Sequence, residues 1–115
     1  MIEISDEDFE ELVCDALDMI PEEFAQQMVN LAFLIEDRNP TNPGILGLYS
    51  GVALPERTFD HTGVLPDTIT IYRESLKEYC QSYEELVQEI IVTVHHEVGH
   101  YFGLEEEDLH RLGWG

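Results

Sequence analysis

Residues 82–103 read SYEELVQEIIVTVHHEVGHYFG, and this stretch predicts the helix around which the fold is organised. Ser82 is followed three residues later by Glu85, a pairing that forms a capping box at a helix start. Apolar side chains then recur at helical spacing along one side: Leu86, Val87, Ile90, Ile91, Val94 and Val98. Gly103 can end the helix by taking a left-handed conformation. One long amphipathic helix is therefore expected.

This helix carries His96, Glu97 and His100 in the pattern H-E-x-x-H. Residues four apart differ by only about 40° around the axis and one turn along it, so both imidazoles face one point. Each can reach a zinc ion at about 2.0–2.1 Å. Glu97 is offset by about 100°, so it reaches a water on the metal rather than the metal itself. The pattern predicts one zinc per chain, with Glu97 as the general base of a hydrolysis.

The third metal ligand is expected after Gly103. Catalytic zinc sites usually use three protein ligands and leave one position open. A sharp turn at Gly103 would bring Glu106 back toward the metal, and a glutamate is a legitimate zinc ligand. Asp108 and His110 are the alternatives, because residues 105–108 form an acidic run in which a shift of one register changes the ligand.

The N-terminal part predicts a second helix and two strands. Ser5 can cap a helix with Asp8 as its partner, and Pro21 ends that helix. Residues 28–35 are mostly apolar and predict a strand buried on both faces. Residues 45–49 predict another strand, which ends at Ser50 and Gly51.

The remaining elements follow from turn residues and alternation. Residues 55–66 are rich in proline, glycine, threonine and aspartate, so a long surface loop is expected. Residues 68–72 alternate polar and β-branched apolar side chains, which favours a third strand. Residues 76–80 suit a short helix, and residues 106–112 suit a final one. The order predicts one α+β domain over residues 1–115, with a small sheet of three or four strands packed on helices that include the metal-binding helix.

The net negative charge of the chain limits the classes of molecule that it is expected to bind. The formal net charge is −20, with only five lysine and arginine residues in 115. Such a surface repels phosphate, so neither nucleic acid nor an anionic membrane is expected as a partner, whereas a peptide or protein substrate is tolerated and a cation is attracted. The acidic N-terminus lacks the basic and apolar regions of a secretory signal, which favours the cytoplasm. Cys14 and Cys80 are accordingly expected as buried free thiols.

Several other residues are candidates for a role at the metal. His95 adjoins His96 but lies about 100° around the helix, so it is expected as a neighbour of the site. His61 falls in the long loop and is expected at the surface. Tyr49, Tyr72 and Tyr101 are candidates for stabilising an oxyanion, although packing is the more common role for any one tyrosine.

The residues from Ser5 to Trp114 resemble the small bacterial zincin-like metallopeptidases, a family of minimal zincins. The resemblance is carried by residues 46–52, 65–73, 95–103 and 109–113, of which the block with H-E-x-x-H is the most specific. It implies an α+β zincin-like fold with the metal helix beneath a small sheet. It also implies the family roles for His96, Glu97 and His100. Relatives commonly have Asp where this chain has Glu106.

A rival hypothesis is a metal-holding or interaction module that keeps the zincin core without proteolysis. A chain of 115 residues has little material for the walls of a substrate cleft, which favours this rival. Glu97 favours the peptidase, since a pure binding site needs no general base there. The sequence leaves the substrate and the oligomeric state open.

Overall fold

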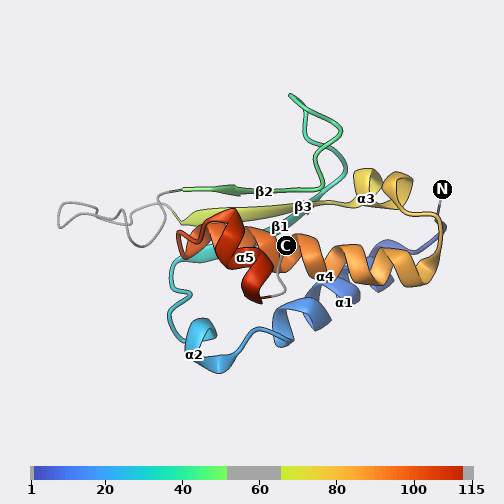
Figure 1. Cartoon of the computed structure of the whole chain (residues 1–115). Helices are drawn as coiled ribbons and strands as arrows, with labels where there is room; N and C mark the ends of the chain where they lie inside the picture. The colour runs from blue at the N-terminus through green and yellow to red at the C-terminus, as the bar shows by residue number, and fades with distance from the viewer. Residues whose placement is uncertain (1, 52–65, 113–115) are drawn as a thin grey trace.

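The computed structural model describes residues 2–51 and 66–112, which form a three-stranded sheet and five helices, with the longest helix running beneath one face of the sheet (Figure 1). In chain order the elements are α1 (Asp6–Asp18), α2 (Glu22–Ala25), β1 (Leu31–Glu36), β2 (Gly47–Ser50), β3 (Asp67–Tyr72), α3 (Arg73–Tyr79), α4 (Tyr83–Tyr101) and α5 (Glu106–Leu112). The predicted α+β class is confirmed, and α4 is the helix that carries H-E-x-x-H. The loop expected at residues 55–66 lies, apart from Pro66, outside the described residues.

The sheet is mixed, in the order β1-β3-β2. β1 runs parallel to β3, and β2 runs antiparallel to it, with Tyr49 opposite Ile69. The central position of β3 explains why it is more buried than its alternating sequence predicted. Ile69 and Ile71 are fully buried toward the helices, and Thr70 on the other face is only 8 % exposed. Its cross-strand neighbours Leu34 and Leu48 flank it on that face.

The prediction that residues 28–35 form a strand buried on both faces was wrong. β1 begins only at Leu31 and is an edge strand, and its residues are half-buried or exposed. Leu34, on the face away from the helices, is 42 % exposed. An uninterrupted apolar run cannot distinguish a central strand from an edge strand whose outward residues happen also to be apolar.

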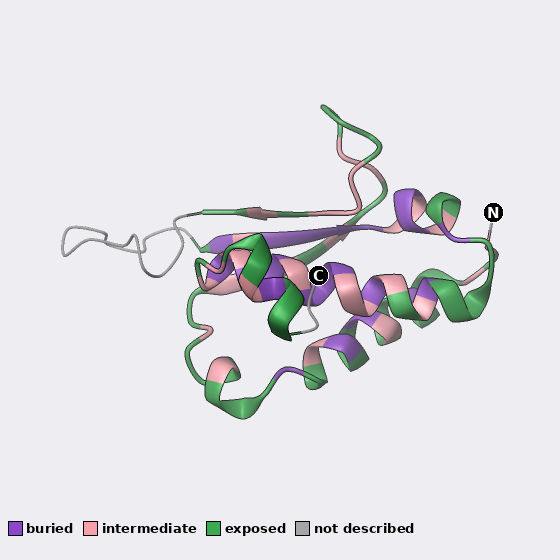
Figure 2. Cartoon of the chain, in the orientation of Figure 1, coloured by how far each residue is buried: buried purple, intermediate pink, exposed green. Residues whose placement is uncertain are grey.

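The core lies between the sheet, α1 and α4 (Figure 2). α1 begins as predicted, because the Ser5 hydroxyl accepts a hydrogen bond from the N–H of Asp8 at 3.1 Å. α4 begins in the same way, with the Ser82 hydroxyl accepting from Glu85 at 3.1 Å. The fully buried side chains along the two helices include Phe9, Ala16, Leu86, Ile90, Val94 and Val98. Full burial of a large apolar side chain contributes roughly 1.5–3 kcal/mol, so this stripe fixes the rotation of α4 about its axis.

The end of α4 has the geometry predicted for it. Gly103 has a φ of +74°, which glycine adopts without steric cost. Its N–H donates to the carbonyl of His100, and the N–H of Leu104 donates to the carbonyl of Gly99, both at 3.0 Å. This pair of bonds is a Schellman motif, and it reverses the chain so that α5 lies beside the last turns of α4 (Figure 1).

Three smaller features complete the fold. The single-turn helix α2, directly after Pro21, was not predicted. Cys80 is buried, and burial raises the pKa of its thiol to about 11. Cys14 is exposed, so the prediction of a buried thiol is confirmed for Cys80 and wrong for Cys14. Even α4, the longest helix described, lacks the continuous apolar sequence that a bilayer crossing requires, as do the other described helices.

Candidate metal centre

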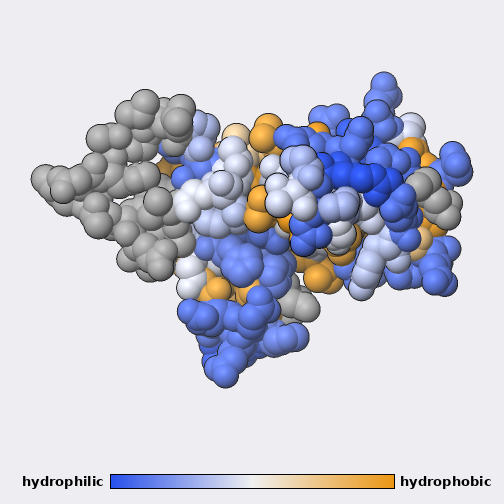
Figure 3. All heavy atoms as spheres, turned by 90° about the horizontal axis from the view of Figure 1, so that it is seen from above, coloured by the Kyte–Doolittle hydropathy of each residue, from blue (hydrophilic) through white to orange (hydrophobic). Residues whose placement is uncertain are grey.

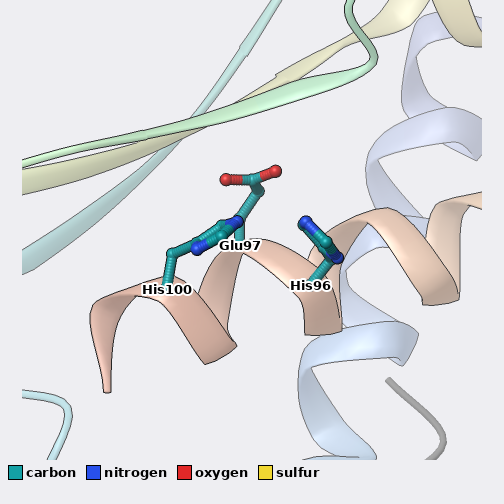
Figure 4. Close-up of side chains that lie close together, drawn as sticks. All are labelled: His96, Glu97 and His100. Atoms are coloured by element: carbon teal, nitrogen blue, oxygen red, sulfur yellow. The ribbon is translucent and has the colours of Figure 1, made fainter. Parts of the chain in front are cut away.

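The H-E-x-x-H residues project from the C-terminal half of α4 toward the sheet (Figure 4). The buried stripe of α4 determines which side of the helix these residues occupy, because Val94 and Val98 are held in the core. His96 and His100 remain partly accessible, whereas Glu97 is 8 % exposed. The helix therefore presents two reachable imidazoles beside one buried carboxylate.

The three side chains form one compact group. Each offers one ligand atom, and these atoms all lie within 4.8 Å of one another. The rings of His96 and His100 are 4.6 Å apart between centroids, with their planes at 81°. Two imidazole nitrogens from positions four apart on one helix are donors that zinc takes in proteins, so His96 and His100 fit this ion. The structure thus brings together the metal-binding and catalytic residues predicted from the pattern.

Glu97 is held from above by the edge strand β2. Its Oε1 accepts a hydrogen bond from the backbone N–H of Tyr49 at 2.9 Å. Burial raises the pKa of the Glu97 carboxyl, and the charge of Glu106 adds to this, whereas His100 and the Tyr49 N–H lower it. A carboxylate whose pKa is raised in this way is a stronger base than one in water.

Gly47 allows β2 to approach α4 at this point. A Cβ atom at position 47 would lie 2.7 Å from Cγ2 of Thr93 and 3.3 Å from Cγ of Glu97. Only a glycine therefore permits the close contact that brings the Tyr49 N–H to Glu97. Sequence reasoning assigned neither residue this role. The available signal was a glycine inside a strand pattern, which often marks a close approach of backbone to another group.

Glu106 lies next to the compact group. Its Oε1 is 3.4 Å from Nε2 of His96, and its side chain is 64 % exposed. The Schellman motif at Gly103 produces this approach by turning the chain back along α4. The structure therefore places the expected third ligand beside one of the two imidazoles.

The two alternative ligands differ from Glu106 in their surroundings. One carboxylate oxygen of Asp108 accepts a hydrogen bond from the N–H of Glu105, and the other pairs with Arg111. Asp108 thus caps α5 and pairs along it. His110 lies on the same helix and is exposed.

His95 serves the core rather than the metal. It is 6 % exposed, and its Nε2 donates to the carbonyl oxygen of Ala16 at 2.8 Å, which links α4 to α1. The 100° offset from His96 thus directs it toward the other helix. His61 lies outside the described residues.

The three candidate tyrosines make hydrogen bonds to other groups. The Tyr49 hydroxyl donates to Asp67 at 2.7 Å, and the Tyr101 hydroxyl lies 3.1 Å from the carbonyl of Val29. The Tyr72 hydroxyl accepts from the side-chain amide of Asn39 at 2.8 Å. Each of the three hydroxyls therefore takes part in the hydrogen bonding of the folded chain.

A helix bearing H-E-x-x-H beneath a small mixed sheet is the arrangement that defines a zincin. The family model for zincin-like metallopeptidase matches residues 14–114, and the chain belongs to this family. The match begins within α1 and continues through α5, so it includes both the sheet and the compact group on α4.

A solved structure that resembles the chain along most of its length supports the same fold. It is a conserved hypothetical protein (TTHA0227) from T. thermophilus, with a TM-score of 0.63 and 24 % sequence identity. The alignment covers 94 % of this chain and 99 % of that one, which supports the fold. No curated protein matches the sequence.

Proposed function

We propose that the chain is a zinc-dependent peptidase that hydrolyses peptide bonds. His96 and His100 would hold one zinc ion per chain, with Glu106 as the third protein ligand. The donor set supports this assignment, since two imidazoles and one carboxylate leave a coordination position open for chemistry. Bound zinc would supply Lewis acidity to the attacking water and to the scissile carbonyl.

Glu97 is the general base in this proposal. It takes a proton from the attacking water and delivers it to the amine that leaves. The observation that carries the proposal is the placement of its carboxylate, which is buried, bonded to the Tyr49 N–H at 2.9 Å, and within 4.8 Å of the imidazole donors. A purely structural metal site has no use for a buried carboxylate of raised pKa beside its ligands.

The test is Glu97→Gln. Glutamine is nearly isosteric, and its amide oxygen can still accept from the Tyr49 N–H, but it cannot take a proton from water. We expect the variant to keep its zinc and to lose about 10²-fold to 10⁴-fold in the rate of peptide cleavage. Zinc is measured by elemental analysis and cleavage with a diverse peptide library.

His100→Ala is the matched control, because it should lose zinc as well as activity. If Glu97→Gln cleaves peptides at the wild-type rate, Glu97 is not the base. If the wild type cleaves no peptide and yet binds zinc through His96 and His100, the chain is a metal-holding module instead.

Charge supports a peptide or protein substrate and opposes nucleic acid or an anionic membrane. Every lysine and arginine in residues 2–51 and 66–112 is already paired with an acid: Arg38 with Glu78, Arg73 with Asp37, Lys77 with Glu74 and Arg111 with Asp108. The described surface therefore offers no unpaired lysine or arginine for a phosphate. With its two free cysteines, the chain is further proposed to work in the cytoplasm.

A further inference from the structure

A cleft opens directly beside the proposed catalytic residues. Its volume is about 340 Å³, and His96 and Glu97 form one end of its lining. Val92 and Thr93, one turn earlier on α4, continue the lining away from the metal group, and the segment 44–47 faces them. A side chain next to the bond under attack would therefore lie against this cleft.

The cleft continues away from the metal group. A second hollow of about 220 Å³ is lined by Gly44, Leu46 and Tyr79, which also line the first. Tyr79, at the end of α3, lines both hollows and is 57 % exposed. An exposed aromatic ring at this position can contact the stem or the charged head of a long side chain.

The charged side chains that line the cleft away from the metal group are acidic. Glu89 is half-buried on α4 and contributes to the first hollow, and Glu78 contributes to the second. Glu78 is already paired with Arg38, at 2.8 Å, whereas Glu89 forms no ion pair with any basic residue that the structure describes. Among the described residues, no lysine or arginine lines either hollow.

We infer that this cleft receives the substrate side chain adjacent to the scissile bond and selects a long basic one, lysine or arginine. The aliphatic stem lies against Ile45, Val92 and Tyr79, and the cationic head meets the Glu89 carboxylate. This inference rests on the proposed function, because it assigns the cleft by its position next to Glu97. Charge complementarity favours a cation over an acid, since the chain carries a net charge of −20.

Each probe peptide carries only one side chain, so the residue that occupies the cleft is known. The probes are acetyl-Gly-Gly-Xaa-Gly-Gly-amide with Xaa as lysine, norleucine or glutamate. Binding is measured with the full-length, zinc-loaded Glu97→Gln variant, which separates recognition from cleavage. Lysine should bind about tenfold tighter than glutamate or better, with norleucine between them.

Glu89→Gln assigns the selectivity to one carboxylate. In the Glu97→Gln background it should weaken the lysine peptide about threefold to tenfold and leave norleucine unchanged. Glu84→Gln is the matched control, because it removes the same charge from an exposed position at the start of α4 that lines neither hollow. It should change neither affinity.

The outcomes separate this inference from the proposed function. Equal binding of the three peptides, no binding of any, or equal losses in Glu89→Gln and Glu84→Gln would overturn it. Wild-type cleavage of all three at equal rates would also overturn it and leave the peptidase intact. Selective binding that depends on Glu89, with no cleavage by the wild type, would support the cleft and refute the peptidase.

Discussion

Glu106 and Asp108 differ in what already surrounds their carboxylates. Asp108 caps α5 and pairs with Arg111, whereas Glu106 faces His96 at 3.4 Å. We therefore expect Glu106→Gln to weaken zinc binding by at least about tenfold, and Asp108→Asn to leave it nearly unchanged. Competition with a chromogenic chelator measures both. Greater zinc loss in Asp108→Asn than in Glu106→Gln would move the ligand to position 108.

Gly47 tests the contact between β2 and α4. Gly47→Ala should destabilise the chain by about 1–3 kcal/mol, because its Cβ would overlap Cγ2 of Thr93. It should also slow cleavage while zinc is retained, since β2 must move away and carry the Tyr49 N–H from Glu97. Chemical denaturation and peptide cleavage measure the two effects.

Thr93→Ser provides the rescue. It removes Cγ2 and keeps the hydroxyl, so the double variant should regain most of the stability and rate lost in Gly47→Ala. Additive losses in the double variant would show that the two residues do not meet as described.

Single residues show where sequence reasoning stops. The positions of His96, Glu97 and His100 could be predicted, because their spacing lies within one helix. The Tyr49 N–H could not, because it is a backbone atom 48 positions from Glu97 and every residue but proline has one. The outward-facing Cys14 was also missed, since its small apolar side chain suits either side of α1.

At the scale of elements, the turn between α4 and α5 links stability to the metal site. Gly103→Ala places a Cβ on a residue with a φ of +74°, which costs roughly 1–2 kcal/mol. We expect it to lower both the free energy of unfolding and the zinc affinity, because α5 carries Glu106.

Ser82→Ala is the control at the other end of α4. It removes the cap and should cost about 1 kcal/mol, with zinc affinity unchanged. Denaturation and chelator competition are measured on both variants. An equal effect on zinc affinity would show that the turn has no specific role in placing Glu106.

The elements with local signals were predictable, and those that depend on their neighbours were not. α1 and α4 carry their own caps and periodicity, so their positions agree with the sequence to within a few residues, and α5 lies at the residues predicted for it. β1 was misjudged because burial of a strand depends on its place in the sheet, which the order β1-β3-β2 alone reveals. The short α2 has too few residues to show a period.

The molecule as a whole is strongly acidic, because its aspartate and glutamate residues far outnumber its lysine and arginine residues. Figure 3 shows mostly hydrophilic residues on the face seen from above, interrupted by small hydrophobic patches. With a net charge of −20, self-repulsion should destabilise the folded state more at low ionic strength. We expect the melting temperature of metal-free protein to rise as sodium chloride increases from about 0.05 M to about 0.5 M.

Choline chloride at the same concentrations should act alike, because screening depends on ionic strength rather than on the cation. A melting temperature that is flat or falls with both salts would show that repulsion is not significant for this fold.

The turn at Gly103 also has a consequence for how metal loading relates to native structure. It keeps the proposed zinc donors within residues 96–106, a segment so short that closing it around an ion costs little chain entropy. The hydrogen bond that holds Glu97, by contrast, exists only when β2 and α4 are docked across 48 positions of sequence. Partly unfolded molecules would therefore keep affinity for zinc after losing the arrangement needed for turnover, and such binding reduces the stabilisation that zinc gives the native state. For this chain, zinc content would overstate the fraction of molecules that are folded and competent.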